Sequence, residues 1–186
     1  MALTFANKVT IGRILIVPLF IATVLYYSSQ RDQLRYAALG IFLVAVISDV
    51  IDGYIARTRQ QKTKAGAILD PLADKILLIS AFICLTIKGE FFPAFKFPIW
   101  LVVTVISRDV ILLIGSMLLY VFRGQLDISP SLWGNATTFF QVASILGIFF
   151  QWSFSEYLWY VTVVLTLISA IDYLRNGIKI LNEHGT

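Results

Sequence analysis

Four aspartates lie close together in a strongly apolar chain, in the stretch SDVIDGYIARTRQQKTKAGAILDPLADK over residues 48–75. Asp49 and Asp52 are three residues apart, and Asp70 and Asp74 are four apart. On a helix, each spacing places both carboxylates of a pair on one face. With no His or Cys nearby, such oxygen ligands favour hard divalent cations such as Mg²⁺ or Mn²⁺. Two ions shared by these carboxylates would approach neutrality, as in a two-metal phosphoryl-transfer site.

The same carboxylates would be costly without cations. Each charge at membrane depth costs about 2.5–3.5 kcal/mol, and mutual repulsion adds to this. Ion pairs with Lys75 and Arg108 are the structural alternative, but these cations are too few to balance the cluster. A cation transporter is the non-enzyme alternative. It is disfavoured because the carboxylates lie near helix ends beside a basic loop, whereas transporters place their sites at the membrane midplane.

Small residues flank the aspartates and leave room for a ligand. Gly53, Ala56 and Gly66 would let a bulky group approach the backbone closely. Glycines in membrane helices also serve helix packing, so each one has this second interpretation. Arg57 could bind a diphosphate with its planar guanidinium group.

A membrane scaffold must position these residues. The chain has 186 residues, of which 58% are hydrophobic and 14% charged, whereas soluble domains average about 25% charged. We therefore predict one all-α polytopic membrane domain over residues 1–186, since only helices or closed barrels span a bilayer and no alternating strands are present. About 20 apolar residues are needed per span. Six runs qualify: Val9–Tyr27, Leu34–Arg57, Ala65–Ile87, Phe97–Phe122, Ala136–Trp152 and Tyr157–Leu181.

Cationic residues between the spans predict how the chain is oriented in the membrane. The loop RTRQQKTK between the second and third spans carries most of the bias. By the positive-inside tendency, this loop, both termini and the aspartates face the cytoplasm. Tryptophans 100, 133, 152 and 159 lie near span ends, as expected for an interfacial belt.

Over residues 49–74 the chain resembles the signature of one protein family without a mismatch. The CDP-alcohol phosphotransferase family is similar in its six helices and in length as well. The matching pattern is Asp49-x2-Asp52-Gly53-x2-Ala56-Arg57-x8-Gly66-x3-Asp70-x3-Asp74.

The resemblance implies transfer of a phosphatidyl group from CDP-diacylglycerol to an alcohol, with release of CMP. It implies that Asp49, Asp52, Asp70 and Asp74 bind two divalent cations and that Asp74 is also the general base. It further implies a homodimer in a lipid bilayer, with no nucleic acid as partner. The residues that it assigns to the CDP moiety are Gly53, Ala56, Arg57 and Gly66.

The acceptor alcohol is indicated by fewer residues. The opening NKVTIGR resembles that of phosphatidylglycerophosphate synthases, which use glycerol 3-phosphate, and it adds Asn7 and Thr10 to the donor-binding set. The segments DGYIAR and GAILDPLADKILL resemble the same branch and the related cardiolipin synthases. Arg108 is a cation within an apolar segment, and an acceptor phosphate would explain it.

Two observations leave the acceptor open. The structural alternative for Arg108 is a partner such as Asp172, because the adjacent Asp109 is expected to face elsewhere. Phosphatidylglycerophosphate synthases commonly open their fifth helix with Gly-Lys-x-Lys-Thr, whereas this chain reads GNATT over residues 134–138. Either Lys64, Lys75 or Arg108 compensates, or the acceptor is phosphatidylglycerol, inositol phosphate or serine. The resemblance places the protein in a bacterial cytoplasmic membrane, or in a mitochondrial inner membrane if the source is eukaryotic.

Overall fold

The computed structural model contains six α-helices, which confirms the predicted all-helical fold for the part of the chain that it describes. It describes the backbone of residues 5–28, 32–59, 64–88, 96–123 and 132–182. Side chains are described at residues 12, 15–28, 32–48, 50, 51, 75–88, 96–116 and 132–176. The helices are α1 (Phe5–Leu25), α2 (Asp32–Arg59), α3 (Lys64–Ile87), α4 (Ile99–Arg123), α5 (Leu132–Phe149) and α6 (Ser155–Asn182).

Each helix overlaps one predicted span, but the ends of the helices differ from those of the apolar runs. Helix α1 begins four residues before the predicted Val9, and α5 begins four before the predicted Ala136. Hydropathy marks only the part of a helix that would cross lipid, whereas helical hydrogen bonding continues into the polar flanks.

Three helices are long and apolar enough to cross a bilayer within the described residues. These segments are Ile99–Ser116 of α4, Leu132–Phe149 of α5 and Ser155–Asn176 of α6. Shorter apolar stretches, Leu15–Leu25 and Lys75–Ile87, lie in α1 and α3.

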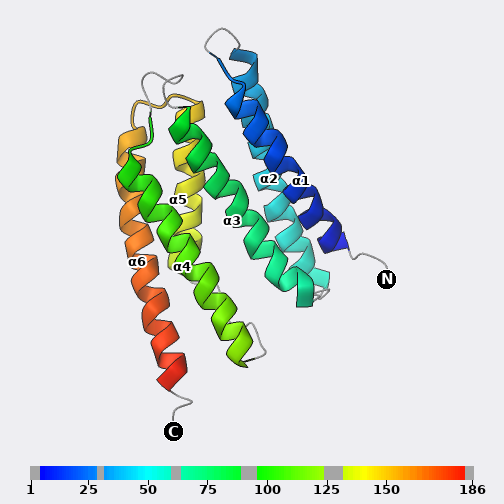
Figure 1. Cartoon of the computed structure of the whole chain (residues 1–186), viewed down its shortest axis with the longest axis vertical. Coiled ribbons are helices and arrows are strands. Elements are labelled where there is room, and N and C mark those ends of the chain that lie inside the picture. Colours follow the sequence, from blue (N-terminus) through cyan, green and yellow to red (C-terminus); the bar gives the residue numbers. More distant parts are fainter. Residues whose placement is uncertain (1–4, 29–31, 60–63, 89–95, 124–131, 183–186) are drawn as a thin grey trace. The chain divides into compact units, whose positions relative to one another are not determined.

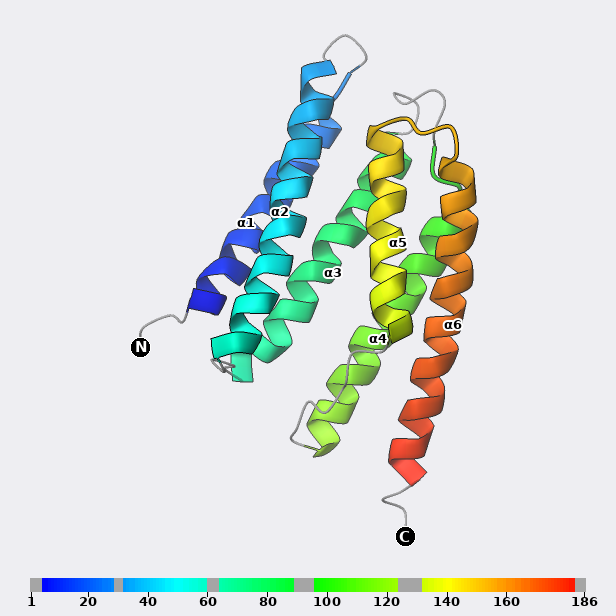
Figure 2. The same cartoon turned by 180° about the vertical axis from the view of Figure 1, so that it is seen from behind.

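The chain divides into two compact units, Met1–Lys96 and Phe97–Thr186. In unit 1, α1 packs against both α2 and α3. Its core includes the rings of Phe20 and Phe42, whose centroids are 5.8 Å apart, and the buried α3 side chains Leu77 and Phe82. Figures 1 and 2 show the start of α1, the end of α2 and the start of α3 at the same end of this unit. The packed core therefore fixes the helices that carry the aspartates.

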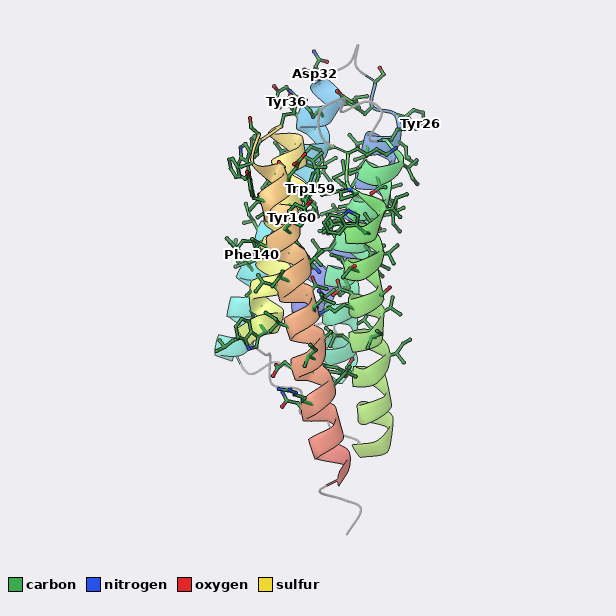
Figure 3. All side chains as sticks on the ribbon, turned by 90° about the vertical axis from the view of Figure 1, so that its left-hand side faces the viewer. Tyr26, Asp32, Tyr36, Phe140, Trp159 and Tyr160 are labelled. Atoms are coloured by element: carbon green, nitrogen blue, oxygen red, sulfur yellow. The ribbon has the colours of Figure 1, made fainter. Side chains whose placement is uncertain are left out.

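In unit 2, α6 packs against both α4 and α5. Figure 3 shows α6 with α5, which carries the labelled Phe140, on one side and α4 on the other. The indole of Trp159, labelled there, lies against the Phe97 ring at 5.7 Å between centroids. Trp159 is only 7% exposed, so the prediction that it belongs to an interfacial belt is wrong.

A tight turn joins α5 to α6. Gln151 has a φ of 53°, and its N–H donates to the Ile148 carbonyl at 3.1 Å. The Trp152 N–H donates to the Gly147 carbonyl at 2.9 Å, which completes a Schellman motif. The chain can therefore reverse within five residues, so that α5 and α6 pack as antiparallel neighbours.

Candidate functional site

Two helices of unit 1 carry the four aspartates. Asp49 and Asp52 lie near the carboxyl end of α2, and Asp70 and Asp74 lie in the first half of α3. Both helices are continuous through these positions, as the sequence pattern requires. The helical repeat then keeps each pair on one side of its helix.

The ends of α2 and α3 cannot lie far apart. Only residues 60–63 separate Arg59 from Lys64, and five Cα–Cα steps of about 3.8 Å span at most about 19 Å. Figures 1 and 2 both show these ends close together, beside the first turns of α1. The first two turns of α1 contain Asn7 and Thr10. The backbone thus brings the predicted donor-binding helices to one end of unit 1.

The side chains of most predicted site residues lie outside the described part of the chain. Their helices and positions along the sequence are defined, but their contacts are not described. Of the predicted acceptor-binding residues in this unit, Lys75 is described and is half-buried on α3. The predicted residues outside the described side chains are Asn7, Thr10, Asp49, Asp52, Gly53, Ala56, Arg57, Lys64, Gly66, Asp70 and Asp74.

Oxygen donors dominate the predicted cation site. The four side chains on α2 and α3 are all carboxylates, so this donor set suits a hard divalent cation. No other group of three or more His, Cys, Asp or Glu side chains that could hold a metal occurs among the side chains that the structure describes. The aspartates therefore fit the cation requirement on the chemistry of their donor atoms.

Arg108, the predicted acceptor-binding residue of unit 2, is buried within the bundle at 5% exposure. Its Nη1 donates to Asp109 Oδ1 at 2.7 Å, and its Nη2 donates to Ser169 Oγ of α6. The expectation that Asp109 faces elsewhere is therefore wrong. Neighbouring residues on a helix point about 100° apart, but the long arginine side chain curls back to the carboxylate, since an unpaired charge would be far costlier in this interior.

The sequence interpretation missed two residues that hold Arg108. Asp109 is completely buried, and Ser169 is 2% exposed. The signal for Asp109 was present, since a carboxylate adjacent to an intramembrane arginine is a candidate partner. Ser169 lies 61 residues away, and only the packing of α6 on α4 reveals it.

The GNATT segment at the start of α5 has two different environments. Asn135 is exposed, whereas Thr137 is completely buried. Thr137 Oγ1 lies 2.8 Å from the Trp133 carbonyl and 3.1 Å from the Leu165 carbonyl of α6. Thr137 therefore belongs to the α5–α6 contact.

Comparisons with known proteins agree on one family. The family model for CDP-alcohol phosphatidyltransferase matches residues 3–168, which covers parts of both units. A "Probable phosphatidylglycerophosphate synthase" of Mycobacterium tuberculosis is 31% identical over 181 residues, 94% of this chain and 81% of that protein. A "CDP-diacylglycerol--glycerol-3-phosphate 3-phosphatidyltransferase" of Aquifex aeolicus is 28% identical, over 94% of this chain and 96% of that protein. A "Cardiolipin synthase (CMP-forming)" of Oryza sativa subsp. japonica is 36% identical over 58% of this chain and 33% of that protein.

Proposed function

Because the chain belongs to the CDP-alcohol phosphatidyltransferase family, we propose that it transfers the phosphatidyl group of CDP-diacylglycerol to glycerol 3-phosphate. The products are phosphatidylglycerophosphate and CMP, in phospholipid biosynthesis. The observation that carries this acceptor is that relatives matched over nearly the whole chain have names specifying glycerol 3-phosphate or phosphatidylglycerophosphate. Family membership also favours an enzyme over a cation transporter.

We propose that Asp49, Asp52, Asp70 and Asp74 bind two divalent cations, Mg²⁺ or Mn²⁺. When bound, these ions neutralise the donor diphosphate and the charge that grows on the CMP leaving group. The carboxylates come from two helices whose ends are joined by a short connection, which supports one shared site.

Asp74 is proposed as the general base. It takes the proton of the acceptor hydroxyl as that oxygen attacks the phosphorus of the phosphatidyl group and the bond to CMP breaks. Asp74 is the carboxylate to which the family resemblance assigns this step, and its position one turn after Asp70 on α3 keeps it on the side of the helix that carries the other ligand.

The remaining predicted residues bind the two substrates. For the donor, Arg57 supplies a guanidinium for the diphosphate, and small residues allow close approach of the nucleotide. For the acceptor, Arg108, Lys64 and Lys75 are the proposed phosphate ligands. The proposed donor-binding set is Asn7, Thr10, Gly53, Ala56, Arg57 and Gly66.

The proposal also covers the domain organisation, the oligomeric state and the membrane location of the enzyme. One catalytic domain over residues 1–186 is supported by the family match, which spans parts of both compact units. We propose a homodimer in a bacterial cytoplasmic membrane, with the aspartates facing the cytoplasm. The basic loop beside them supports this orientation.

A cardiolipin synthase that uses phosphatidylglycerol as acceptor is the second candidate. Two observations favour it: the lysine-free GNATT segment and the 36% identity to the rice enzyme. The rice match is partial, so glycerol 3-phosphate remains the first choice.

An acceptor screen tests the proposal. Purified protein is incubated with CDP-diacylglycerol labelled in its lipid part, Mg²⁺ or Mn²⁺, and one of four acceptors: glycerol 3-phosphate, phosphatidylglycerol, inositol phosphate or serine. We expect phosphatidylglycerophosphate and CMP with glycerol 3-phosphate only, and no product after chelation with EDTA or in Asp74→Asn. Cardiolipin as the sole product would select the second candidate, and the absence of any product would refute both.

A further inference from the structure

Ser169 is a buried serine of α6 whose hydroxyl contacts the guanidinium of Arg108 on α4. Its Oγ accepts a hydrogen bond from Arg108 Nη2, while Asp109 Oδ1 accepts one from Nη1 at 2.7 Å. Ser169 is 2% exposed and Arg108 is 5% exposed, so both lie within unit 2. The two terminal nitrogens of the guanidinium are therefore held by partners on two different helices.

A second contact, one turn further along both helices, fixes how α4 and α6 pack. Tyr173 Oη donates to the Leu112 carbonyl at 3.5 Å, and these residues are 61 positions apart, as Arg108 and Ser169 are. A Cβ added at Gly115 would lie only 2.6 Å from Tyr173 Oη, so the two helices approach closely there. The equal separation shows that α4 and α6 keep one register over both turns. The packing of α4 on α6 thus presents the serine hydroxyl to the guanidinium.

The guanidinium keeps a donor that neither contact uses. Arg108 Nε is buried and has no hydrogen-bond partner among the described residues. A buried donor without a partner is unfavourable, and a ligand oxygen that accepts from it would remove this penalty. Phosphate oxygens match a guanidinium in charge and in geometry. The unpaired Nε–H is therefore an observation that points to an anionic ligand of Arg108.

The two partners of Arg108 act on its binding of an anion in different ways. Asp109 balances the positive charge, which a buried guanidinium requires in the absence of a ligand. Ser169 is neutral, so it orients the guanidinium without reducing its attraction for phosphate. A long side chain that is fixed before a ligand arrives loses less conformational entropy on binding. The serine contact therefore favours phosphate binding by preorganisation.

We propose that Ser169 is a positioning residue that holds Arg108 Nη2 and so fixes the plane of the guanidinium, with Nε left to donate to the acceptor phosphate. This inference rests on the proposed function, in which Arg108 binds the phosphate of glycerol 3-phosphate. Ser169 touches neither substrate and acts only through Arg108. The affinity for the acceptor should therefore depend on Ser169, whereas the affinity for the CDP-linked donor should not.

The test measures KM for each substrate separately in Ser169→Ala. The full-length enzyme is assayed for CMP release with CDP-diacylglycerol, glycerol 3-phosphate and Mg²⁺, and each substrate is varied in turn. We expect KM for glycerol 3-phosphate to rise about tenfold, as the loss of one hydrogen bond to a charged group predicts. KM for CDP-diacylglycerol and kcat should stay within about twofold of the wild type, because only acceptor binding is weakened.

Two further variants separate positioning from packing. Ser144 of α5 is also a completely buried serine of unit 2, and its Oγ is hydrogen-bonded to Thr162 Oγ1 at 2.9 Å. Ser144→Ala therefore makes the same chemical change away from Arg108, and it should leave both KM values and kcat near the wild type. Ser169→Cys keeps the side-chain volume but offers only a weak acceptor, so it should raise KM for glycerol 3-phosphate as Ser169→Ala does.

The outcomes distinguish this inference from the proposed function. Wild-type turnover of glycerol 3-phosphate with an unchanged acceptor KM in Ser169→Ala would overturn the positioning role and leave the proposed function standing. An equal rise of the acceptor KM in Ser144→Ala, or equal changes for donor and acceptor, would have the same meaning. So would an unchanged acceptor KM in Ser169→Cys, which decides the matter even where the alanine variant does not fold. No wild-type turnover of glycerol 3-phosphate would refute the proposed function and the role of Ser169 with it.

Discussion

The Arg108–Asp109 pair gives a sharp prediction about the stability of unit 2. The two groups are 2.7 Å apart, Asp109 is completely buried and Arg108 is 5% exposed. Asp109→Asn keeps the shape but removes the charge that balances the guanidinium. Breaking a buried pair by removing one partner costs about 3–5 kcal/mol, so we expect the free energy of unfolding to fall by about this amount.

Removing both charges should cost much less. Replacing a buried pair with apolar residues of similar size is often neutral or stabilising, because neither charge then has to be desolvated. We therefore expect Arg108→Met/Asp109→Leu to unfold near the wild type, although it should lose activity if Arg108 binds the acceptor. The difference between double and single variants measures the coupling of the pair.

The distribution of tryptophan and cysteine allows each unit to be followed separately. The four tryptophans, at positions 100, 133, 152 and 159, all lie in unit 2. The single cysteine, the buried Cys84, lies in unit 1. Unfolding by SDS in mixed micelles can therefore be followed by tryptophan fluorescence for unit 2 and by thiol labelling for unit 1.

Two results would refute this reasoning. Tryptophan unfolding of Asp109→Asn within about 1 kcal/mol of the wild type would show that the pair contributes little to stability. A double variant as unstable as the single one would show that the loss comes from packing and not from an uncompensated charge.

Three further predictions concern other parts of the fold. Gly115→Ala would place a Cβ 2.6 Å from Tyr173 Oη and should cost about 1–3 kcal/mol, measured by tryptophan unfolding. Gly40→Ala in unit 1, with nothing within 4 Å of the new Cβ, is the contrasting case and should be neutral or stabilising when unfolding is followed by thiol labelling of Cys84. Gln151→Gly should stabilise unit 2 by about 1 kcal/mol, because the φ of 53° suits glycine; no gain would contradict the assigned turn. Burial, with help from the hydrogen bond to Asp32, raises the pKa of Tyr27 above 10.0. The protonated Tyr27 hydroxyl therefore stabilises the folded state below pH 10, and this contribution is lost as the pH rises through the folded-state pKa. In Tyr27→Phe we expect helicity, followed by circular dichroism, to fall less steeply as the pH rises through this range.

Hydropathy predicted the helices well because each apolar run must be long enough to cross lipid. It could not predict the helix ends, as the early starts of α1 and α5 show, since polar residues also continue a helix. It also misassigned Trp159, because position near a span end does not determine which side of the helix faces the interior. The contact with Phe97 depends on how α4 and α6 pack.

The site could be predicted from sequence only where its residues are close along the chain. The spacing of Asp49, Asp52, Asp70 and Asp74 is a local property of two helices joined by a short connection. The environment of Arg108 is not local, because Ser169 reaches it from another helix.

The lysine-free start of α5 also has a physical explanation in this packing. Thr137 is buried against α6 and hydrogen-bonded to the Leu165 carbonyl, so a lysine there would have to bury an ammonium group or separate the helices. Asn135 is exposed, so a lysine at that position would not lie within the bundle. Of the described cationic side chains of unit 2, Arg108 and Arg175, only Arg108 is buried. Among the described side chains of this unit, Arg108 is therefore the one buried cation, which supports the proposal that it binds the acceptor phosphate.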